Sequence, residues 1–208
     1  MSQAPEPQVL ADLLDRLQYF SLSPNRVLDL GAGTGQSAEQ LQRRFPRAQL
    51  LAIDIAEATL QVMPRARWPW QRAKLARICA DPGALPLAPD SIELIFSNLM
   101  LQGCDQPDAV LRELARVLKP GGLLLLSTLG PSHASPPLDI QQLGEALMRA
   151  GFAEPVLDLE QYRADTQAEG LAAAYEVIFA AAFAGDSRGV SGPGEFAVPV
   201  SAVKAMRR

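Results

Sequence analysis

The feature that most constrains the fold is a short apolar run that ends in a glycine-rich turn and then opens a helical segment. The run covers Arg26 to Leu30, and Gly31, Gly33 and Gly35 follow it at alternate positions. A continuous apolar run is typical of a parallel strand whose two faces are both covered by helices. Glycines at the start of a helix let backbone N–H groups approach an anionic ligand. This segment therefore predicts a nucleotide-type site at the first strand of an α/β fold.

The rest of the chain alternates between helical and strand-like patterns. Helical spacing covers residues 8–19, 35–45, 56–63, 107–118 and 139–150. Strand-like runs cover residues 48–53, 75–79, 92–97 and 123–128, and two later runs cover 156–159 and 174–183. The last two runs leave little room for a crossover helix, so they predict an antiparallel pair. We expect a mostly parallel sheet with an antiparallel edge pair and helices on both faces.

Length and composition limit the classes of protein. A chain of 208 residues with 48% hydrophobic residues is long enough for one domain with a core. We expect one domain over residues 1–208, with a leading helix in 1–22, a cofactor-binding half in 23–130 and C-terminal strands and a tail in 131–208. A formal net charge of −4 argues against a nucleic-acid binder.

Cysteine and histidine are too few for a metal cluster. The chain holds Cys79, Cys104 and a single histidine, His133, so we expect no metal site and treat both thiols as packing residues. The first residues lack a basic stretch followed by an apolar core, and no apolar run reaches about 18 residues. We therefore expect a cytoplasmic protein without membrane contact.

Two acidic residues strengthen the nucleotide-type interpretation. Asp54 ends the second strand, nineteen residues after Gly35, where a carboxylate can accept hydrogen bonds from both ribose hydroxyls. Asp81 follows the third strand, where it can accept from an adenine amino group or cap a short helix. The glycines are spaced GxGxG and not GxGxxG, which argues against an NAD-dependent oxidoreductase.

Four segments resemble, in order, the motifs of class I S-adenosylmethionine-dependent methyltransferases: VLDLGAGTG, AID, CADPGALPLAPDSIELIFSN and ELARVLKPGGLLLLST. The resemblance implies the Rossmann-like fold of that class and S-adenosyl-L-methionine as cofactor. It implies that Asp29 orients the methionine part, Asp54 holds the ribose and Asp81 contacts the adenine. The cofactor-binding residues implied in this way are Asp29, Gly31, Ala32, Gly33, Gly35, Asp54, Ile55, Asp81, Pro82 and Asn98.

Further segments are similar to the malonyl-[acyl-carrier protein] O-methyltransferases of biotin synthesis, among them SNLMLQGC, STLGP and LGEALMRAGFAEPVLDLE. This resemblance implies O-methylation of a small or carrier-linked carboxylic acid. The chain departs from the subfamily in its missing Tyr-Asp segment, in Gly103 at a common Trp position, and in short connections at 132–138 and 160–174. Those connections build the substrate cover in the subfamily. The alternative is a non-catalytic relative that acts as a binding or regulatory partner.

Sequence points to only one weak catalytic candidate. His133 follows the fifth strand and could act as a base, although a solvated loop histidine is the commoner case. Methyl transfer from a sulfonium to a carboxylate removes no proton, so alignment and desolvation are sufficient. The segment after the fourth strand either lines the methyl-donor pocket, with Asn98, Met100 and Gln102, or forms an ordinary loop. Lys119 to Gly122 predicts a helix stop and a turn.

A basic segment around Trp68 and Trp70 is the last candidate. Its interleaved basic residues could receive an acidic carrier protein or a nucleic acid, or the segment is a solvated loop. If the substrate cover is short, a second subunit could shield the cleft, so we expect that a homodimer would bury the surface near His133 or this tryptophan pair.

Overall fold

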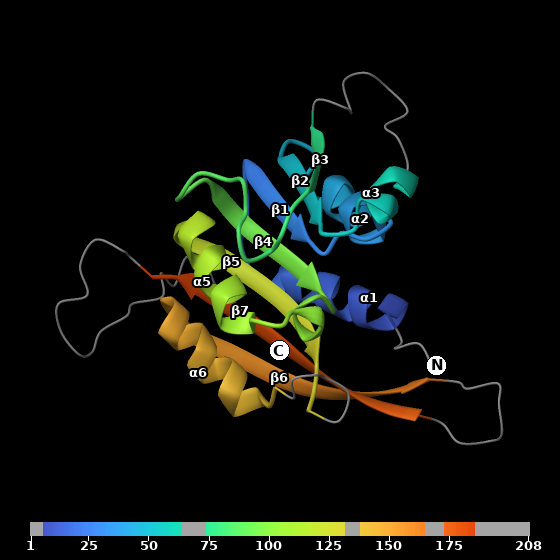
Figure 1. The fold of residues 1–208 in the computed structure, drawn as a ribbon, viewed down its shortest axis with the longest axis vertical. Helices are drawn as coiled ribbons and strands as arrows, with labels where there is room; N and C mark the ends of the chain where they lie inside the picture. The colour runs from blue at the N-terminus through green and yellow to red at the C-terminus, as the bar shows by residue number, and fades with distance from the viewer. Residues whose placement is uncertain (1–5, 64–73, 132–137, 165–172, 186–208) are drawn as a thin grey trace.

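The computed structural model describes residues 6–63, 74–131, 138–164 and 173–185. Within these ranges the chain builds one seven-stranded sheet in the order β3-β2-β1-β4-β5-β7-β6 (Figure 1). The strands are β1 (Arg26–Leu30), β2 (Gln49–Asp54), β3 (Leu75–Cys79), β4 (Ile92–Asn98), β5 (Leu118–Leu129), β6 (Phe152–Ala164) and β7 (Ala173–Ala184). Strands β1 to β5 pair in parallel, and β7 runs antiparallel to both β5 and β6. The predicted sheet with an antiparallel edge pair is confirmed.

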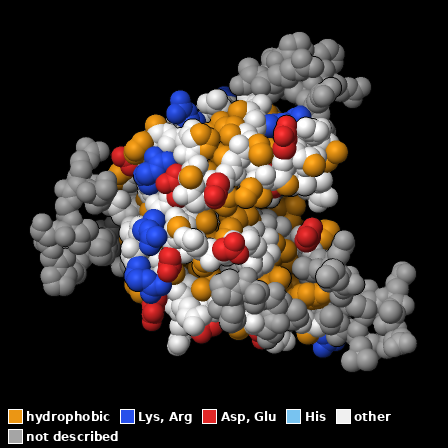
Figure 2. All heavy atoms as spheres, viewed as in Figure 1, with side chains coloured by type: hydrophobic (Ala, Val, Ile, Leu, Met, Phe, Trp, Pro, Cys, Tyr) orange, Lys and Arg blue, Asp and Glu red, His pale blue; other side chains and the backbone are white. Residues whose placement is uncertain are grey.

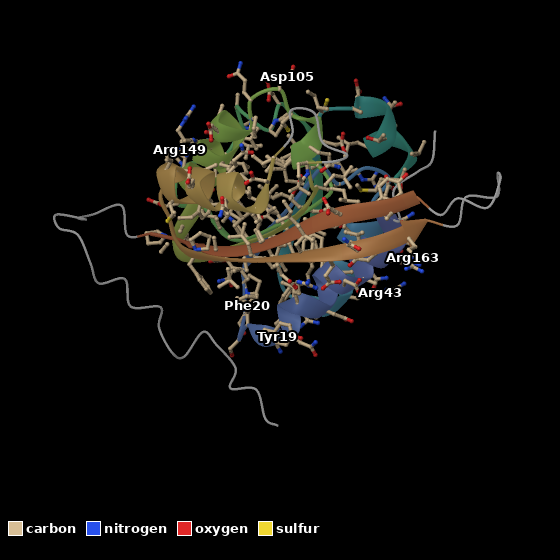
Figure 3. All side chains as sticks on the ribbon, turned by 90° about the horizontal axis from the view of Figure 1, so that it is seen from below. Tyr19, Phe20, Arg43, Asp105, Arg149 and Arg163 are labelled. Atoms are coloured by element: carbon tan, nitrogen blue, oxygen red, sulfur yellow. The ribbon has the colours of Figure 1, made fainter. Side chains whose placement is uncertain are left out.

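Helices cover both faces of the sheet, as predicted. They are α1 (Glu6–Arg16), α2 (Gln36–Arg44), α3 (Glu57–Val62), α5 (Pro107–Val117) and α6 (Ile140–Ala150), with 3-10 turns η1 (Leu17–Tyr19) and η2 (Leu101–Gly103). One core cluster joins the sheet to α5 and α6, and the other joins it to α1, α2 and α3. In Figure 3, Asp105 lies on the side of the sheet that carries α6, while Tyr19 and Phe20 lie on the α1 side.

Local sequence explains where α6 begins and ends. Asp139 caps its start by accepting a hydrogen bond from Gln142 N, and the Gln142 side chain accepts from Asp139 N in return. Gly151 ends the helix with a φ of 102°, a conformation that glycine adopts readily. The chain turns there directly into β6, so the helix and the edge strand pack side by side.

Two predicted segments differ from the structure. Lys119 to Gly122 is not a separate turn, because β5 begins at Leu118, directly after α5, and carries an irregular register beside Ile92. Gly121 takes a φ of 74° within this irregularity. Strand β6 is longer than the predicted run 156–159, because charged residues on an exposed edge interrupt the apolar pattern.

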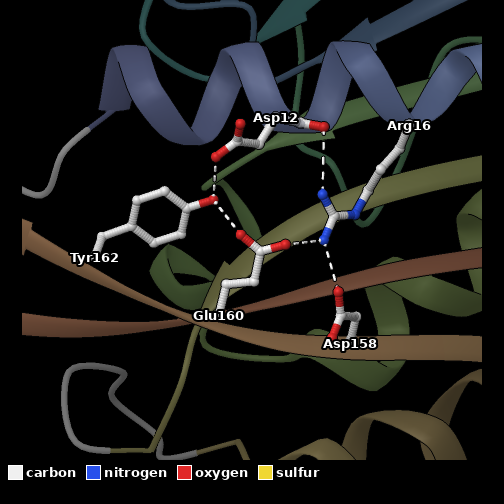
Figure 4. A network of polar contacts seen from close by, with 5 residues as sticks. All are labelled: Asp12, Arg16, Asp158, Glu160 and Tyr162. Atoms are coloured by element: carbon white, nitrogen blue, oxygen red, sulfur yellow. Dashed lines mark hydrogen bonds and ion pairs between the residues drawn. The ribbon is translucent and has the colours of Figure 1, made fainter.

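Helix α1 is held to β6 by a set of charged and polar side chains, which we call the α1–β6 network: Asp12, Arg16, Asp158, Glu160 and Tyr162 (Figure 4). Arg16 donates to Asp158 Oδ2 at 2.8 Å and to Glu160 Oε1 at 2.5 Å. The phenol oxygen of Tyr162 lies 2.5 Å from Asp12 Oδ2 and 3.1 Å from Glu160 Oε2. Burial raises the pKa of Tyr162, and the two carboxylates raise it further, so the phenol keeps its proton and donates it.

Candidate functional site

The glycine turn lies at the carboxyl end of β1 and is tied to the end of β2. Gly31 N and Ala32 N both donate to the carbonyl of Ile53, at 2.8 and 3.1 Å. The φ angles of Gly31, Gly33 and Gly35 are 75°, 50° and 93°, in a region that side-chain-bearing residues rarely adopt. The turn thus brings the first backbone amides of α2 to the edge of the sheet where parallel α/β folds bind ligands.

Asp54, the last residue of β2, braces this turn and still has acceptor capacity. Its Oδ2 accepts from Gly33 N at 2.8 Å, and its Oδ1 accepts from Ala56 N at 2.9 Å. Each carboxylate oxygen has two acceptor positions, so one on each oxygen remains for a ligand. Asp54 can therefore hold a pair of neighbouring hydroxyl groups while it fixes the turn.

A cavity of about 500 Å³ opens beside Asp54. Its wall includes Ile55, whose side chain is 69% exposed, although a large apolar residue is normally stabilised by burial. Four predicted cofactor residues besides Gly31 line it: Asp54, Ile55, Asp81 and Pro82. Cys104 also lines it, together with residues that the sequence did not single out, namely Ala80, Gly83, Ala84, Asp105, Gln106, Ala109 and Val110.

A smaller cavity of about 210 Å³ lies on the other side of the glycine turn. It is lined by Glu6, Leu10, Gly31, Ala32, Gly33, Thr34, Gln36, Ser37, Asn98 and Leu99. Gly31 lines both cavities, so the two adjoin at this residue. Together they offer a large, partly apolar compartment next to a small polar one.

Met100 lies against Gly31, at the point where the cavities adjoin. A Cβ on Gly31 would come within 2.6 Å of Met100 Cβ and Cγ, so only glycine fits there. Leu99 has a φ of 50°, a strained value for a residue with a side chain. Its N–H is held by Ser127, and its carbonyl accepts from Gln102 Nε2. The strained backbone places Met100 over the glycine, a feature without a recognisable sequence signal.

Asp29 lies beneath the turn and lines neither of these cavities. Its side chain is buried, and its Oδ2 accepts from Ser37 Oγ at 2.7 Å. Burial raises the pKa of Asp29 to about 7, although the Ser37 hydrogen bond lowers it, and the charge of Asp54 adds to the rise. The structure therefore separates Asp29 from the cavity walls, whereas the resemblance implied that it orients the cofactor.

Asp81 forms a turn and does not cap a helix, so that alternative was wrong. Its Oδ1 accepts from Gly83 N at 2.8 Å, and its carbonyl accepts from Ala84 N. This local hydrogen bond satisfies the backbone of a tight turn. Asp81 keeps an exposed carboxylate on the wall of the larger cavity.

The remaining candidates fall into different places. Asn98 lines the smaller cavity, and Met100 lines the larger one. Gln102 lines neither cavity. Its Oε1 accepts from Thr128 Oγ1 and so links η2 to the end of β5. Gly35 also lines neither, and a Cβ on it would collide with Met63. The following candidates lie outside the described residues: His133, Trp68 and Trp70.

The two cysteines differ from each other. Burial raises the pKa of Cys104, and the charges of Asp81 and Asp105 add to the rise, so this thiol is a poor nucleophile. Cys79 is exposed, with its Sγ 3.4 Å from the carbonyl oxygen of Ile55, so the prediction that it is a packing residue was wrong. Within the described ranges, no three His, Cys, Asp or Glu residues gather where they could hold a metal ion.

Comparison with known proteins shows a family match and a shared fold. The family profile named "Methyltransferase domain" matches residues 28–126, which span the glycine turn and both acidic positions. The structure resembles that of Haemonchus contortus phosphoethanolamine N-methyltransferase 2 in complex with S-adenosyl-L-methionine. The TM-score is 0.67 at 18% identity, and the match covers 85% of this chain and 53% of that one. The chain therefore matches the methyltransferase domain family over residues 28–126 and shares the fold of S-adenosylmethionine-dependent methyltransferases.

The chain is also similar in sequence to the malonyl-[acyl-carrier protein] O-methyltransferases. It is 41% identical over 174 residues to the protein of that name from Gallionella capsiferriformans (strain ES-2). The match covers 74% of this chain and 60% of that relative, so the chain spans about three fifths of the relative's length.

The fold by itself does not specify the reaction. The [4+2]-cyclase SpnF has a similar structure, with a TM-score of 0.67 at 22% identity, and the match covers 85% of this chain and 80% of that one. One fold therefore hosts different chemistries, so the reaction has to be argued from the site. No helix in the described part of the chain is long and apolar enough to cross a membrane.

Proposed function

We propose that this chain binds S-adenosyl-L-methionine and transfers its methyl group to the free carboxylate of a malonyl thioester borne by an acyl carrier protein. The observation that carries the proposal is the position of Asp54. This carboxylate ends β2 on the wall of the larger cavity, with an acceptor position left on each oxygen.

The residues around the two cavities fit the parts of this cofactor. In the larger cavity, Asp54 would accept from the ribose hydroxyls, and the exposed side chain of Ile55 would cover an adenine face. Asp81 has a free carboxylate edge for the adenine amino group. The smaller cavity is polar and would take the amino-acid end. Gly31 allows the cofactor to pass from one cavity to the other, because it has no side chain.

The chemistry asks little of the protein beyond positioning. When bound, the cofactor supplies a sulfonium methyl that a carboxylate oxygen attacks, and the sulfur leaves as a neutral thioether without any proton transfer. The chain's contribution would be to hold donor and acceptor in line and to exclude water. Gln102 and Ser127 support this role, because their hydrogen bonds fix the strained backbone at Leu99 beside Met100.

The names of the relatives support the choice of a malonyl carrier as acceptor. We further propose that residues 1–208 act as one methyltransferase domain in the cytoplasm, without nucleic-acid or membrane partners. We also propose that the chain forms a homodimer in which the second subunit shields the cleft. Light scattering tests it, and a monomer at working concentration would remove the dimer from the proposal.

The test is a methyl-transfer assay on malonyl-carrier protein with methyl-labelled S-adenosyl-L-methionine. We expect a labelled methyl ester and an equal amount of S-adenosylhomocysteine. Acetyl-carrier protein is the matched control, because it lacks the free carboxylate and should gain no label. Binding of the cofactor without turnover on the malonyl substrate would contradict the proposed reaction and favour the non-catalytic alternative.

A further inference from the structure

The smaller cavity has hydrogen-bond donors along one part of its wall. Gln36 and Ser37 occupy the first turn of α2, where backbone N–H groups have no acceptor within the helix. Asn98 Oδ1 accepts from Ser127 Oγ, which leaves the side-chain N–H groups of Asn98 as donors. A carboxylate is the group that best matches such donors at the positive end of a helix.

Another part of the same wall carries a single negative charge. Glu6, in the first turn of α1, is the only acidic side chain among the described residues that line this cavity. It makes no ion pair with any other residue that the structure describes. An exposed carboxylate without a cationic partner is well placed to receive an ammonium group.

Asp29 is poorly placed to bind such an ammonium group. Its side chain is only 1% exposed, its Oδ2 is engaged by Ser37, and it lines neither cavity. The acidic residue of the first strand therefore stabilises the turn from below, and the charge that meets the cavity comes from α1.

We propose that Glu6 binds the α-ammonium group of the cofactor's amino-acid end, while Asn98 and the first amides of α2 bind its α-carboxylate. This inference rests on the proposed function, because it assumes that the cofactor occupies both cavities. Glu6 is a binding residue in this scheme, and it makes the start of α1 part of the site.

The experiment compares two ligands on Glu6→Gln and wild-type protein by calorimetry. S-adenosylhomocysteine carries the amino-acid end, and 5′-methylthioadenosine lacks it. Since Glu6 is exposed, we expect Glu6→Gln to weaken S-adenosylhomocysteine about three- to tenfold. Binding of 5′-methylthioadenosine should stay within about twofold of wild type. The matched control is Asp15→Asn, which removes one charge from the same helix at a residue outside the cavity wall, and it should change neither affinity.

The outcomes separate the explanations. If Glu6→Gln leaves S-adenosylhomocysteine binding unchanged, the Glu6 assignment is wrong and the proposed function stands. If the variant weakens both ligands equally, Glu6 acts only as an acidic residue that stabilises the first turn of α1, and the assignment is again wrong. If the wild-type protein binds neither ligand, both the assignment and the proposed function fail.

Discussion

The carboxyl edge of the parallel strands and the α1–β6 network are both rich in polar groups, but these groups are arranged differently. In the network, Arg16 and Tyr162 bond to carboxylates of the same chain. At the carboxyl edge, Asp54 keeps free acceptor positions beside a cavity, and the first amides of α2 lack helical acceptors. Groups satisfied within the protein stabilise the fold, whereas groups with remaining capacity beside a cavity can bind a ligand.

The largest expected effect tests the structural side of this comparison. Arg16→Ala leaves Asp158 and Glu160 without their cation and removes the guanidinium that lies 3.8 Å from the ring centroid of Phe179. We expect the free energy of unfolding to fall by about 3 kcal/mol. Denaturant unfolding measures it, with Arg43→Ala as control, because Arg43 forms only an exposed pair with Glu39. A variant as stable as the control would show that the network is not a stabilising contact.

The next prediction tests whether the carboxyl edge of the parallel strands binds a ligand. Asp54→Ala removes the two acceptor positions offered to ribose, so we expect affinity for S-adenosylhomocysteine to fall about 30- to 100-fold, as measured by calorimetry. The ligand-free protein should lose about 1 to 2 kcal/mol of stability as well, because Gly33 N and Ala56 N lose their acceptor. Unchanged affinity in a folded variant would remove Asp54 from the site.

A pair of glycines isolates the contact between the two cavities. Gly31 and Gly121 have nearly equal φ angles, 75° and 74°, but a Cβ would collide with Met100 only at Gly31. We expect Gly121→Ala to cost about 1 kcal/mol from the backbone alone, and Gly31→Ala to cost about 2 kcal/mol more. Thermal unfolding of the two variants gives the difference. Equal costs would mean that Met100 moves freely and does not close over the turn.

The smallest effect sharpens the contrast between Asp29 and Asp54. The pKa of Asp29 is about 7 in the folded protein, above its ordinary value of 3.8. Between these values the folded state keeps the proton that the unfolded chain releases, so this group's contribution to stability falls as the pH rises from about 4 to 7. Asp29→Asn removes this dependence while still accepting from Ser37. Relative to wild type, the variant should therefore gain about 1 kcal/mol as the pH rises from 5 to 6.

Denaturation at several pH values measures this difference. A constant difference between the two proteins would show that Asp29 is ionised in the fold. Glu39→Gln is a suitable control, because Glu39 is an exposed carboxylate whose replacement should give no comparable pH dependence.

The central strands of the parallel half could be predicted from sequence because they are buried on both faces. The predicted bounds of β1 agree with the structure to the residue, and so do those of the partly buried edge strand β3. The edge strand β6 was underestimated, since Asp158 and Glu160 face the α1–β6 network and interrupt its apolar pattern. The length of such a strand is set by its pairing with residues that are distant in sequence, and the local sequence pattern does not contain that information.

The site could be predicted only in part, for a similar reason. Asp54 and the glycine turn lie in one contiguous βαβ unit, so their spacing carries the signal. Glu6, Met100 and Asp105 reach the cavities through the packing of α1 and the loop after β4, which no local motif marks. Asp29 matched the motif, yet its burial depends on how Ser37 and the turn pack above it.

The most direct test of the ligand site is thermal unfolding of the wild-type protein with and without S-adenosylhomocysteine, with Asp54→Ala measured in parallel. At about 100 times the dissociation constant, a ligand that binds only the native state adds roughly 2.7 kcal/mol. For a chain of this size we expect Tm to rise by about 5 to 10 °C in the wild-type protein. In Asp54→Ala the same ligand concentration should raise Tm by only about 1 to 3 °C, because the affinity is about 30- to 100-fold weaker. A wild-type Tm that does not move at saturating ligand would contradict the assignment of the carboxyl edge as a cofactor site.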